Sequence, residues 1–107
     1  MLFEDNFKQR VLQVLNSVPY GKVTTYGNIA KLAGSPRAAR QVGAILKGLP
    51  NDTLLPWHRV VNREGKIVLM GDAYKIQCQH LIEEGVVFNQ MSGYIDLKLF
   101  GWMMDGV

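Results

Sequence analysis

Apolar residues recur at helical spacing in four stretches of the chain, and short β-branched runs separate these stretches. In the last stretch, Ile76, His80 and Leu81 fall on one face, and Gly85 follows as a stop signal. The spacing predicts four helices, over residues 6–17, 26–32, 36–47 and 73–84.

Residues that favour helix ends flank the first three predicted helices. Asp5 and Thr25 are expected to cap the first and second helices. Ser35 is expected to cap the third, with Pro36 at its first helical position. Because only residues 33–35 separate the second and third helices, the pair is typical of a helix-turn-helix.

The β-branched runs predict a small amount of β-structure. Val60-Val61, a turn over 62–65 and a returning run over 66–69 predict a small hairpin, the wing of a winged helix. A further hairpin is expected from 86–88 and 94–97, whereas the apolar tail over 100–104 either packs back or frays. The prediction is one α+β domain over 1–107, mostly helical and built on a winged helix-turn-helix.

Composition narrows the class of protein. At 107 residues and 48% apolar, the chain can form one small core. Its longest apolar stretch, over 54–61, is interrupted by Pro56, His58 and Arg59, so no membrane span is expected. The first five residues lack a signal pattern, and Cys78 is the single cysteine, so we expect a cytoplasmic protein without disulfides.

The charge is unevenly distributed. Residues 6–75 hold eleven Lys and Arg against three acidic residues, a net charge of +8, whereas residues 76–107 carry −3. A basic body with an acidic tail indicates a polyanionic partner, with a surface of ordinary solvated lysines as the alternative.

The third predicted helix has an unusual composition for a DNA-reading helix. Two small residues, Ala38 and Ala39, lie between Arg37 and Arg40, and a third, Gly43, follows Arg40 by three positions. A major-groove reader usually offers long polar side chains, whereas small residues let a backbone approach a minor groove. Its amino-terminal end, from Ser35, also favours phosphate. The alternative is an amphipathic helix with solvated arginines and a core face, formed by Val42, Ile45 and Leu46.

Residues 56–61, Pro-Trp-His-Arg-Val-Val, resemble the Pro-Cys-His-Arg-Val motif of the O6-alkylguanine-DNA alkyltransferases, with Trp57 in place of the reactive cysteine. The resemblance covers about 7–85 and includes Tyr26, the Pro36–Arg40 run and Glu84-Gly85, whereas 86–107 has no match. In having tryptophan in place of the cysteine, the sequence resembles the alkyltransferase-like proteins, which bind alkylated DNA without repairing it. The implied fold is the carboxy-terminal domain of the alkyltransferases.

The resemblance implies roles for individual residues. Tyr26 matches the tyrosine that rotates the target nucleotide, and Arg40 matches the arginine that fills the gap in the base stack. Arg59 matches a structural arginine, and His58 and Glu84 match the pair that activates the thiol, here without a thiol to activate. The implied lesion pocket consists of Trp57, Tyr26, Val60, Val61, Met70 and Gly71, and DNA binding is assigned to Tyr26, Arg40, Arg37, Ser35, Ala38, Ala39 and Gly43.

Several positions depart from the family pattern. Leu49 stands where the family has an asparagine hinge, although Asn51 is near. Met70 and Gly71 stand where the family has a tyrosine and a serine at the pocket, and Gln41 replaces a small residue.

The chemistry of indole excludes alkyl transfer at position 57, because a thiolate is the nucleophile that this reaction needs. Stacking of a base on an aromatic ring contributes about 1–3 kcal/mol, which is similar to the cost of flipping a damaged base. The expected function is therefore a non-enzymatic sensor of O6-alkylguanine in duplex DNA that uses no cofactor. The resemblance further implies shielding of the lesion and its handover to nucleotide excision repair, and we expect a monomer.

Three alternatives remain open. Cys78, or a water held by His58 and Glu84, could give residual alkyltransferase or hydrolase activity. A winged-helix regulator could read a DNA sequence instead of a lesion. His58, Cys78 and His80 could be metal ligands, although their spacing is a weak match, and no metal is expected.

Overall fold

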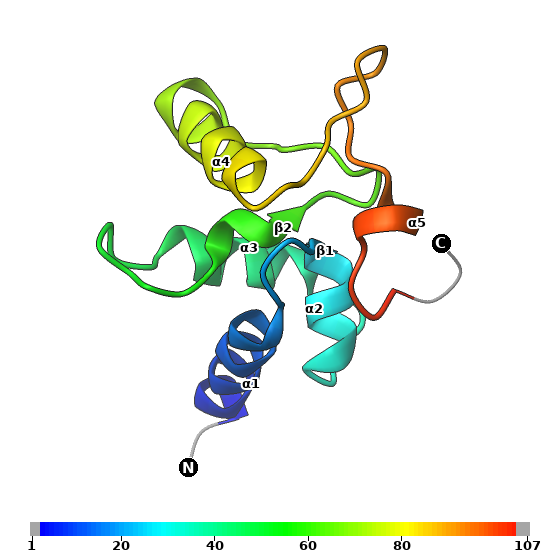
Figure 1. The fold of residues 1–107 in the computed structure, drawn as a ribbon. Helices are drawn as coiled ribbons and strands as arrows, with labels where there is room; N and C mark the ends of the chain where they lie inside the picture. Colours follow the sequence, from blue (N-terminus) through cyan, green and yellow to red (C-terminus); the bar gives the residue numbers. More distant parts are fainter. Residues whose placement is uncertain (1–2, 105–107) are drawn as a thin grey trace.

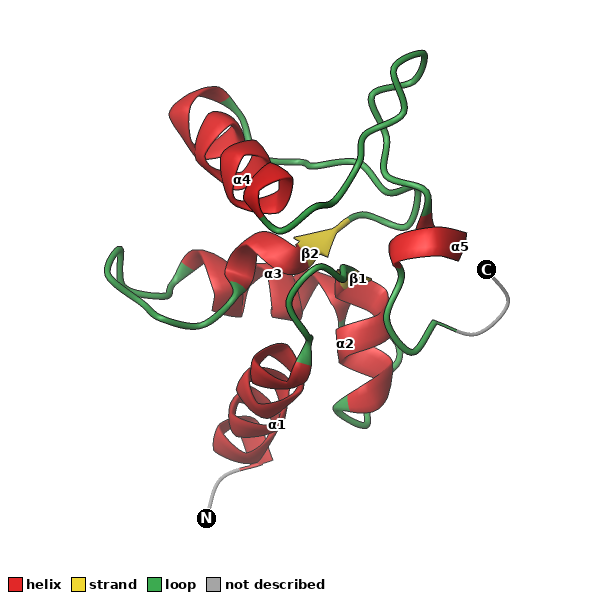
Figure 2. Ribbon diagram, viewed as in Figure 1, coloured by secondary structure: helices red, strands yellow, loops and turns green. Residues whose placement is uncertain are grey.

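The computed structural model describes residues 3–104, in which helices dominate and one small parallel sheet lies at the centre (Figures 1 and 2). No helix in this range is long and apolar enough to span a bilayer. The elements in chain order are α1 (Phe3–Ser17), β1 (Thr24–Thr25), α2 (Tyr26–Leu32), α3 (Ala39–Lys47), the 3-10 helix η1 (Trp57–Arg59), β2 (Val60–Val61), α4 (Gly71–Glu83) and α5 (Leu97–Phe100).

The sheet consists of β1 and β2 side by side, with Thr24 opposite Val60 and Thr25 opposite Val61. Successive side chains of a strand point to opposite faces, so Val60 packs into one apolar cluster and Val61 into another. The first cluster is formed mainly by α1, α2 and α3, and the second by α4 together with segments before and after it. Because η1 leads directly into β2, the sheet fixes η1 between the two clusters.

The first two helices follow the predictions, with one correction. The helix α1 begins at Phe3, so Asp5 lies inside it and is not its cap. Thr25 caps α2 as predicted, because its hydroxyl accepts a hydrogen bond from the Asn28 N–H at 3.0 Å.

The prediction of α3 was wrong at its beginning. The Ser35 N–H closes α2 by donating to the Ala30 carbonyl at 2.9 Å, while Gly34 adopts a φ of +93°. Residues 35–38 form a turn, in which the Ala38 N–H donates to the Ser35 carbonyl at 2.9 Å, so α3 begins at Ala39 without a side-chain cap. Ser35 is thus not a helix cap, and Pro36 and Arg37 lie in an exposed turn. The helix-turn-helix arrangement itself is present, because α2 and α3 pack against each other.

The predicted wing is a turn without a second strand. The Asn62 carboxamide oxygen accepts from the backbone N–H groups of Glu64 and Lys66, both at 2.9 Å. Gly65 adopts a φ of +85°, and a Cβ at this position would overlap the Ile95 carbonyl oxygen. Residues 66–69 form no strand, and β2 pairs with β1 instead.

The buried face of α4 differs from the prediction. The helix buries Gln77 and Leu81, whereas Ile76 and His80 are exposed. The periodicity failed here because a polar residue occupies the core position. The Gln77 side chain can be buried because its amide donates hydrogen bonds to the carbonyls of His58 and Val60 at 3.0 and 2.9 Å.

The chain after α4 folds back onto the sheet. Phe88 and Ile95 form a single antiparallel bridge, so the second predicted hairpin is present in reduced form and projects away from the helices (Figure 1). The Val23 N–H donates to the Phe100 carbonyl at 2.9 Å, and the Trp102 N–H donates to the Val23 carbonyl at 2.8 Å. The apolar tail therefore packs back along the edge of β1.

Candidate functional site

A cavity of about 650 Å³ opens between α2, α3, η1 and the segment that precedes α4. Its volume is in the range of small-molecule sites. The lining is largely apolar and contains no acidic residue; its described members are Tyr26, Ala39, Arg40, Gly43, Ala44, Leu46, Lys47, Trp57, Val68, Leu69 and Gln77.

One face of α3 forms a wall of the cavity. Arg40, Gly43, Ala44 and Lys47 are spaced by three, four and seven residues, which places them on the same side of a helix. The middle of this wall has only the small residues Gly43 and Ala44, and the cationic side chains of Arg40 and Lys47 lie at its two ends. The Tyr26 ring lies 4.0 Å from where a Gly43 Cβ would be, so a small residue at this position lets the ring approach α3.

Tyr26 begins α2 and lines the cavity next to α3. Partial burial raises the pKa of its phenol, so the hydroxyl keeps its proton at neutral pH and can donate a hydrogen bond.

Trp57, the first residue of η1, is half-buried and lines the cavity together with Tyr26 and Arg40. Its ring meets the rings of His58 and His80 edge-on, with centroid separations of 6.0 and 6.2 Å. The indole is therefore held by neighbouring rings and still borders a space large enough for a base.

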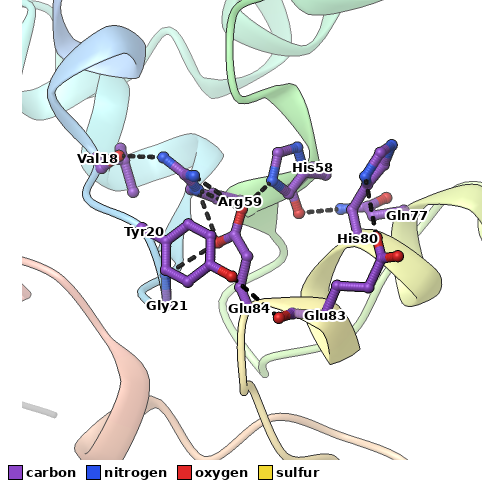
Figure 3. A network of polar contacts seen from close by, with 9 residues as sticks. All are labelled: Val18, Tyr20, Gly21, His58, Arg59, Gln77, His80, Glu83 and Glu84. Carbon is purple, nitrogen blue, oxygen red and sulfur yellow. Dashed lines mark hydrogen bonds and ion pairs between the residues drawn. The ribbon is translucent and has the colours of Figure 1, made fainter.

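A polar cluster surrounds His58 and Arg59 of η1 (Figure 3), and neither of these two residues lines the cavity. The Glu84 carboxylate, at the end of α4, accepts hydrogen bonds from the His58 Nε2 at 2.7 Å and from the Gly21 N–H at 2.9 Å. The Arg59 guanidinium donates to both Glu84 oxygens, and its shortest contact is 2.7 Å. The carboxylate therefore connects η1, the end of α4 and the turn after α1.

Arg59 extends this cluster to the residue that follows α1 by donating to the Val18 carbonyl at 2.8 Å. The Tyr20 hydroxyl donates to the Glu83 carbonyl at 3.0 Å, which joins the same segments a second time (Figure 3). Arg59 thus joins three parts of the fold.

The cluster perturbs two ionisable groups. Burial alone would raise the pKa of Glu84, but the hydrogen bonds from Arg59, Gly21 and His58 outweigh it and lower the pKa to about 2. Burial lowers the pKa of His58, against the opposing effect of Glu84. At neutral pH His58 is therefore uncharged, and its Nε2–H donates to the ionised carboxylate.

The structure brings together five of the residues predicted for the lesion pocket and for DNA binding: Tyr26, Ala39, Arg40, Gly43 and Trp57. Ser35, Arg37 and Ala38 lie outside the lining, in the turn before α3.

Four predicted pocket residues lie elsewhere. Val60 and Val61 are 1% and 0% exposed, because each points into an apolar cluster on one face of the sheet. Met70 is 85% exposed at the beginning of α4, next to the exposed Gly71, and neither lines the cavity.

The remaining members of the lining were not predicted from the sequence. Ala44 and Lys47 share the helical spacing of Arg40 and Gly43, so this signal was present in the sequence. Val68, Leu69 and Gln77 come from segments whose placement depends on tertiary packing, and no local pattern marks them. Leu46 was assigned only to a core face.

The alternative reactive residues are not gathered at the cavity. Cys78 packs against the second apolar cluster and does not line the cavity. Within the described part of the chain, no group of three or more His, Cys, Asp or Glu side chains could hold a metal ion.

Comparisons with known proteins give a consistent result. Residues 6–86 match the family described as 6-O-methylguanine DNA methyltransferase, DNA binding domain. A DNA base-flipping protein of Escherichia coli is 58% identical over 99 residues, which are 92% of this chain and 76% of the relative. Alkyltransferase-like protein 1 of Schizosaccharomyces pombe is 44% identical over 92 residues, which are 82% of this chain and 83% of the relative.

Solved structures show the same relationship. The crystal structure of S. pombe Atl1 in complex with damaged DNA containing O6-carboxymethylguanine superposes with a TM-score of 0.85 at 38% identity, over 97% of this chain and 100% of that one. Mycobacterium tuberculosis OGT in complex with DNA superposes with a TM-score of 0.67 at 37% identity, over 73% of this chain and 48% of that one. The chain therefore belongs to the family of the 6-O-methylguanine DNA methyltransferase DNA-binding domain, as one of its alkyltransferase-like members.

Proposed function

We propose that the protein binds duplex DNA at O6-alkylated guanines and holds the damaged base, flipped out of the helix, in the cavity beside Trp57 without removing the alkyl group. The helix α3 docks in the minor groove, Tyr26 rotates the nucleotide, and Arg40 fills the gap in the base stack. The proposal depends on one observation above all, that Tyr26, Arg40 and Trp57 line one cavity of about 650 Å³.

The composition of the cavity suits an alkylated purine. Its apolar lining and the Trp57 indole can pack against both a base and an alkyl group, at about 0.8 kcal/mol for each buried methylene. Flipping costs a few kcal/mol and costs less for a base whose pairing is damaged. These opposing contributions are similar in size, so a lesion can be captured where normal guanine is not.

The relatives support this proposal by what they are known to bind. A relative with 58% identity is a DNA base-flipping protein, and Atl1 is seen in a complex with DNA that contains O6-carboxymethylguanine. The net charge of +8 over residues 6–75 also suits a polyanionic partner.

The absence of alkyl transfer follows from the side chain at position 57. The motif of residues 56–61 places Trp57 where the alkyltransferases have their reactive cysteine, and indole is not a nucleophile under mild conditions. Glu84 is hydrogen-bonded to both His58 and Arg59, so this cluster serves to hold η1.

We further propose that the bound protein shields the lesion from alkyltransferases and delivers it to nucleotide excision repair, and that it acts as a cytoplasmic monomer. A protein that binds a lesion and leaves it in place benefits the cell only if another system excises the damage. Delayed repair of O6-methylguanine duplexes by an added alkyltransferase would support shielding, and unchanged repair would contradict it.

The central test compares the affinities for matched duplexes with and without one O6-methylguanine, at one stated salt concentration. Tighter binding to the damaged duplex is expected, together with a log–log salt slope of about −0.9 for each neutralised phosphate. Equal affinity for the two duplexes would overturn the proposal.

Mass spectrometry after incubation with alkylated DNA tests the enzymatic alternative. We expect unmodified protein and unchanged lesion, whereas an alkyl adduct on the protein or regenerated guanine would show that the protein is an enzyme. A preferred undamaged sequence would instead identify a regulator.

A further inference from the structure

We propose that Lys47 makes the cavity selective for O6 adducts that carry an anionic group, such as a carboxymethyl group. This inference rests on the proposed function, because it concerns which lesions the same cavity holds best.

The position of Lys47 separates it from the residue assigned to the base stack. Lys47 and Arg40 lie seven residues apart on the cavity face of α3, which is about 10 Å along the helix. This separation equals about three base steps, so the two side chains leave the helix opposite different parts of the duplex. Arg40 can therefore enter the stack while Lys47 remains at the other end of the cavity wall.

The charge of Lys47 is not neutralised by the protein. The described lining of the cavity contains no Asp or Glu, and among the side chains that the structure describes, over residues 7–104, none forms a hydrogen bond or ion pair with the Lys47 amine. By contrast, the Arg59 cation is fully engaged with Glu84 and Val18. Of these two cations, Lys47 is thus the one available to a ligand.

Lys47 is exposed in the free protein, and apolar residues surround it at the cavity wall. Between Lys47 and Arg40 the wall consists of Gly43 and Ala44, and Leu46 and Trp57 supply further apolar surface. A flipped base would displace water from these surfaces, and a charge-assisted hydrogen bond in a poorly hydrated site is stronger than one in bulk water. A carboxylate on a short O6 substituent matches the ammonium in charge and in hydrogen-bonding capacity.

The experiment measures the affinities of the whole protein for three duplexes that differ at one guanine. They carry O6-carboxymethylguanine, its neutral isostere O6-carbamoylmethylguanine, or unmodified guanine. We expect the wild-type protein to prefer the carboxymethyl over the carbamoylmethyl duplex by about five- to tenfold, the gain of one partly screened charge-assisted hydrogen bond. Lys47→Met should abolish this preference, and Lys47→Arg should keep it.

Lys75→Met is the matched control, because Lys75 is exposed on α4 and does not line the cavity. It removes the same charge and should leave the preference intact. Salt titrations on the unmodified duplex supply a second measurement: Lys47→Met should not change the slope, whereas loss of a phosphate contact would reduce it by about 0.9.

Each outcome decides the question. If Lys47→Met loses affinity equally for all three duplexes and has a reduced salt slope, Lys47 contacts a phosphate. This result would overturn the inference while the proposed function stands. Equal wild-type affinity for the two adducts would do the same. Failure of the wild-type protein to distinguish either adduct from guanine would instead overturn the proposed function.

Discussion

The 3-10 helix η1 has two sides that differ in the way their polar groups are used. On one side, Glu84 accepts hydrogen bonds from His58, Arg59 and Gly21, with a shortest contact of 2.7 Å, and the charges neutralise each other. On the other side, Trp57 borders an apolar cavity whose described lining includes the cations Arg40 and Lys47 but no Asp or Glu. The first arrangement is complete within the protein, whereas the second has groups available for a ligand.

This difference explains how three successive residues can serve two purposes. Residues 57–59 form one helical turn, so Trp57 is presented to the cavity while His58 and Arg59 are fixed to α4 and α1. A rigid support reduces the entropy lost when a base stacks on the indole. We expect changes in the polar cluster to act on stability and changes in the cavity to act on DNA binding.

The largest effect is expected from Glu84→Ala. Removing the carboxylate leaves the nearly buried Arg59 cation unpaired and should lower the free energy of unfolding by about 3–5 kcal/mol. Urea denaturation measures the change. Glu83→Ala is the control, because the Glu83 side chain is 60% exposed and should contribute little. Similar stabilities of the two variants would refute the assignment of Glu84 as the centre of the cluster.

Acid should weaken the same cluster. The pKa of Glu84 is about 2 in the folded state and lies near 4.5 when unperturbed, so its contribution is present above about pH 5 and is lost as the pH falls toward 2. The full shift corresponds to at most about 3 kcal/mol. His58 acts in the same direction because its pKa is also lowered. Unfolding curves of Glu84→Gln between pH 6 and about pH 2 should therefore be flatter than those of the wild type, and parallel curves would contradict the low pKa.

On the cavity side, Trp57→Ala should weaken binding to an O6-methylguanine duplex by about ten- to a hundredfold, the value of one base–aromatic stack. The affinity for undamaged DNA should hardly change. Trp57→Phe keeps a flat ring and should retain most of the binding. Fluorescence anisotropy at constant salt makes the comparison, and an equal loss on both duplexes would argue against stacking on the indole.

The smallest expected effect is a difference in DNA binding between substitutions of two arginines in the helix-turn-helix. Arg40 lines the cavity, whereas Arg37 lies in the exposed turn before α3. Arg40→Ala should reduce the preference for the damaged duplex by about tenfold if its guanidinium replaces the flipped base. Arg37→Ala should reduce the affinity for both duplexes slightly and equally, as the loss of a phosphate contact would. The same ratio of affinities in both variants would exclude a special role for Arg40.

Much of the molecule follows from local sequence. The Thr25 cap fixes the beginning of α2, periodicity identifies the four main helices within a few residues, and residues 56–61 identify the family. These features depend on neighbouring residues, so a one-dimensional pattern is sufficient to find them.

Tertiary structure decided what local patterns could not. Val60 and Val61 were expected in the pocket, but parallel pairing with Thr24 and Thr25 directs them into two cores. Gln77 is buried because two carbonyls from η1 and β2 accept its amide hydrogens, a partnership between residues seventeen and nineteen positions apart. Burial of a polar side chain depends on partners that are distant in the sequence, so hydrophobic periodicity cannot predict it.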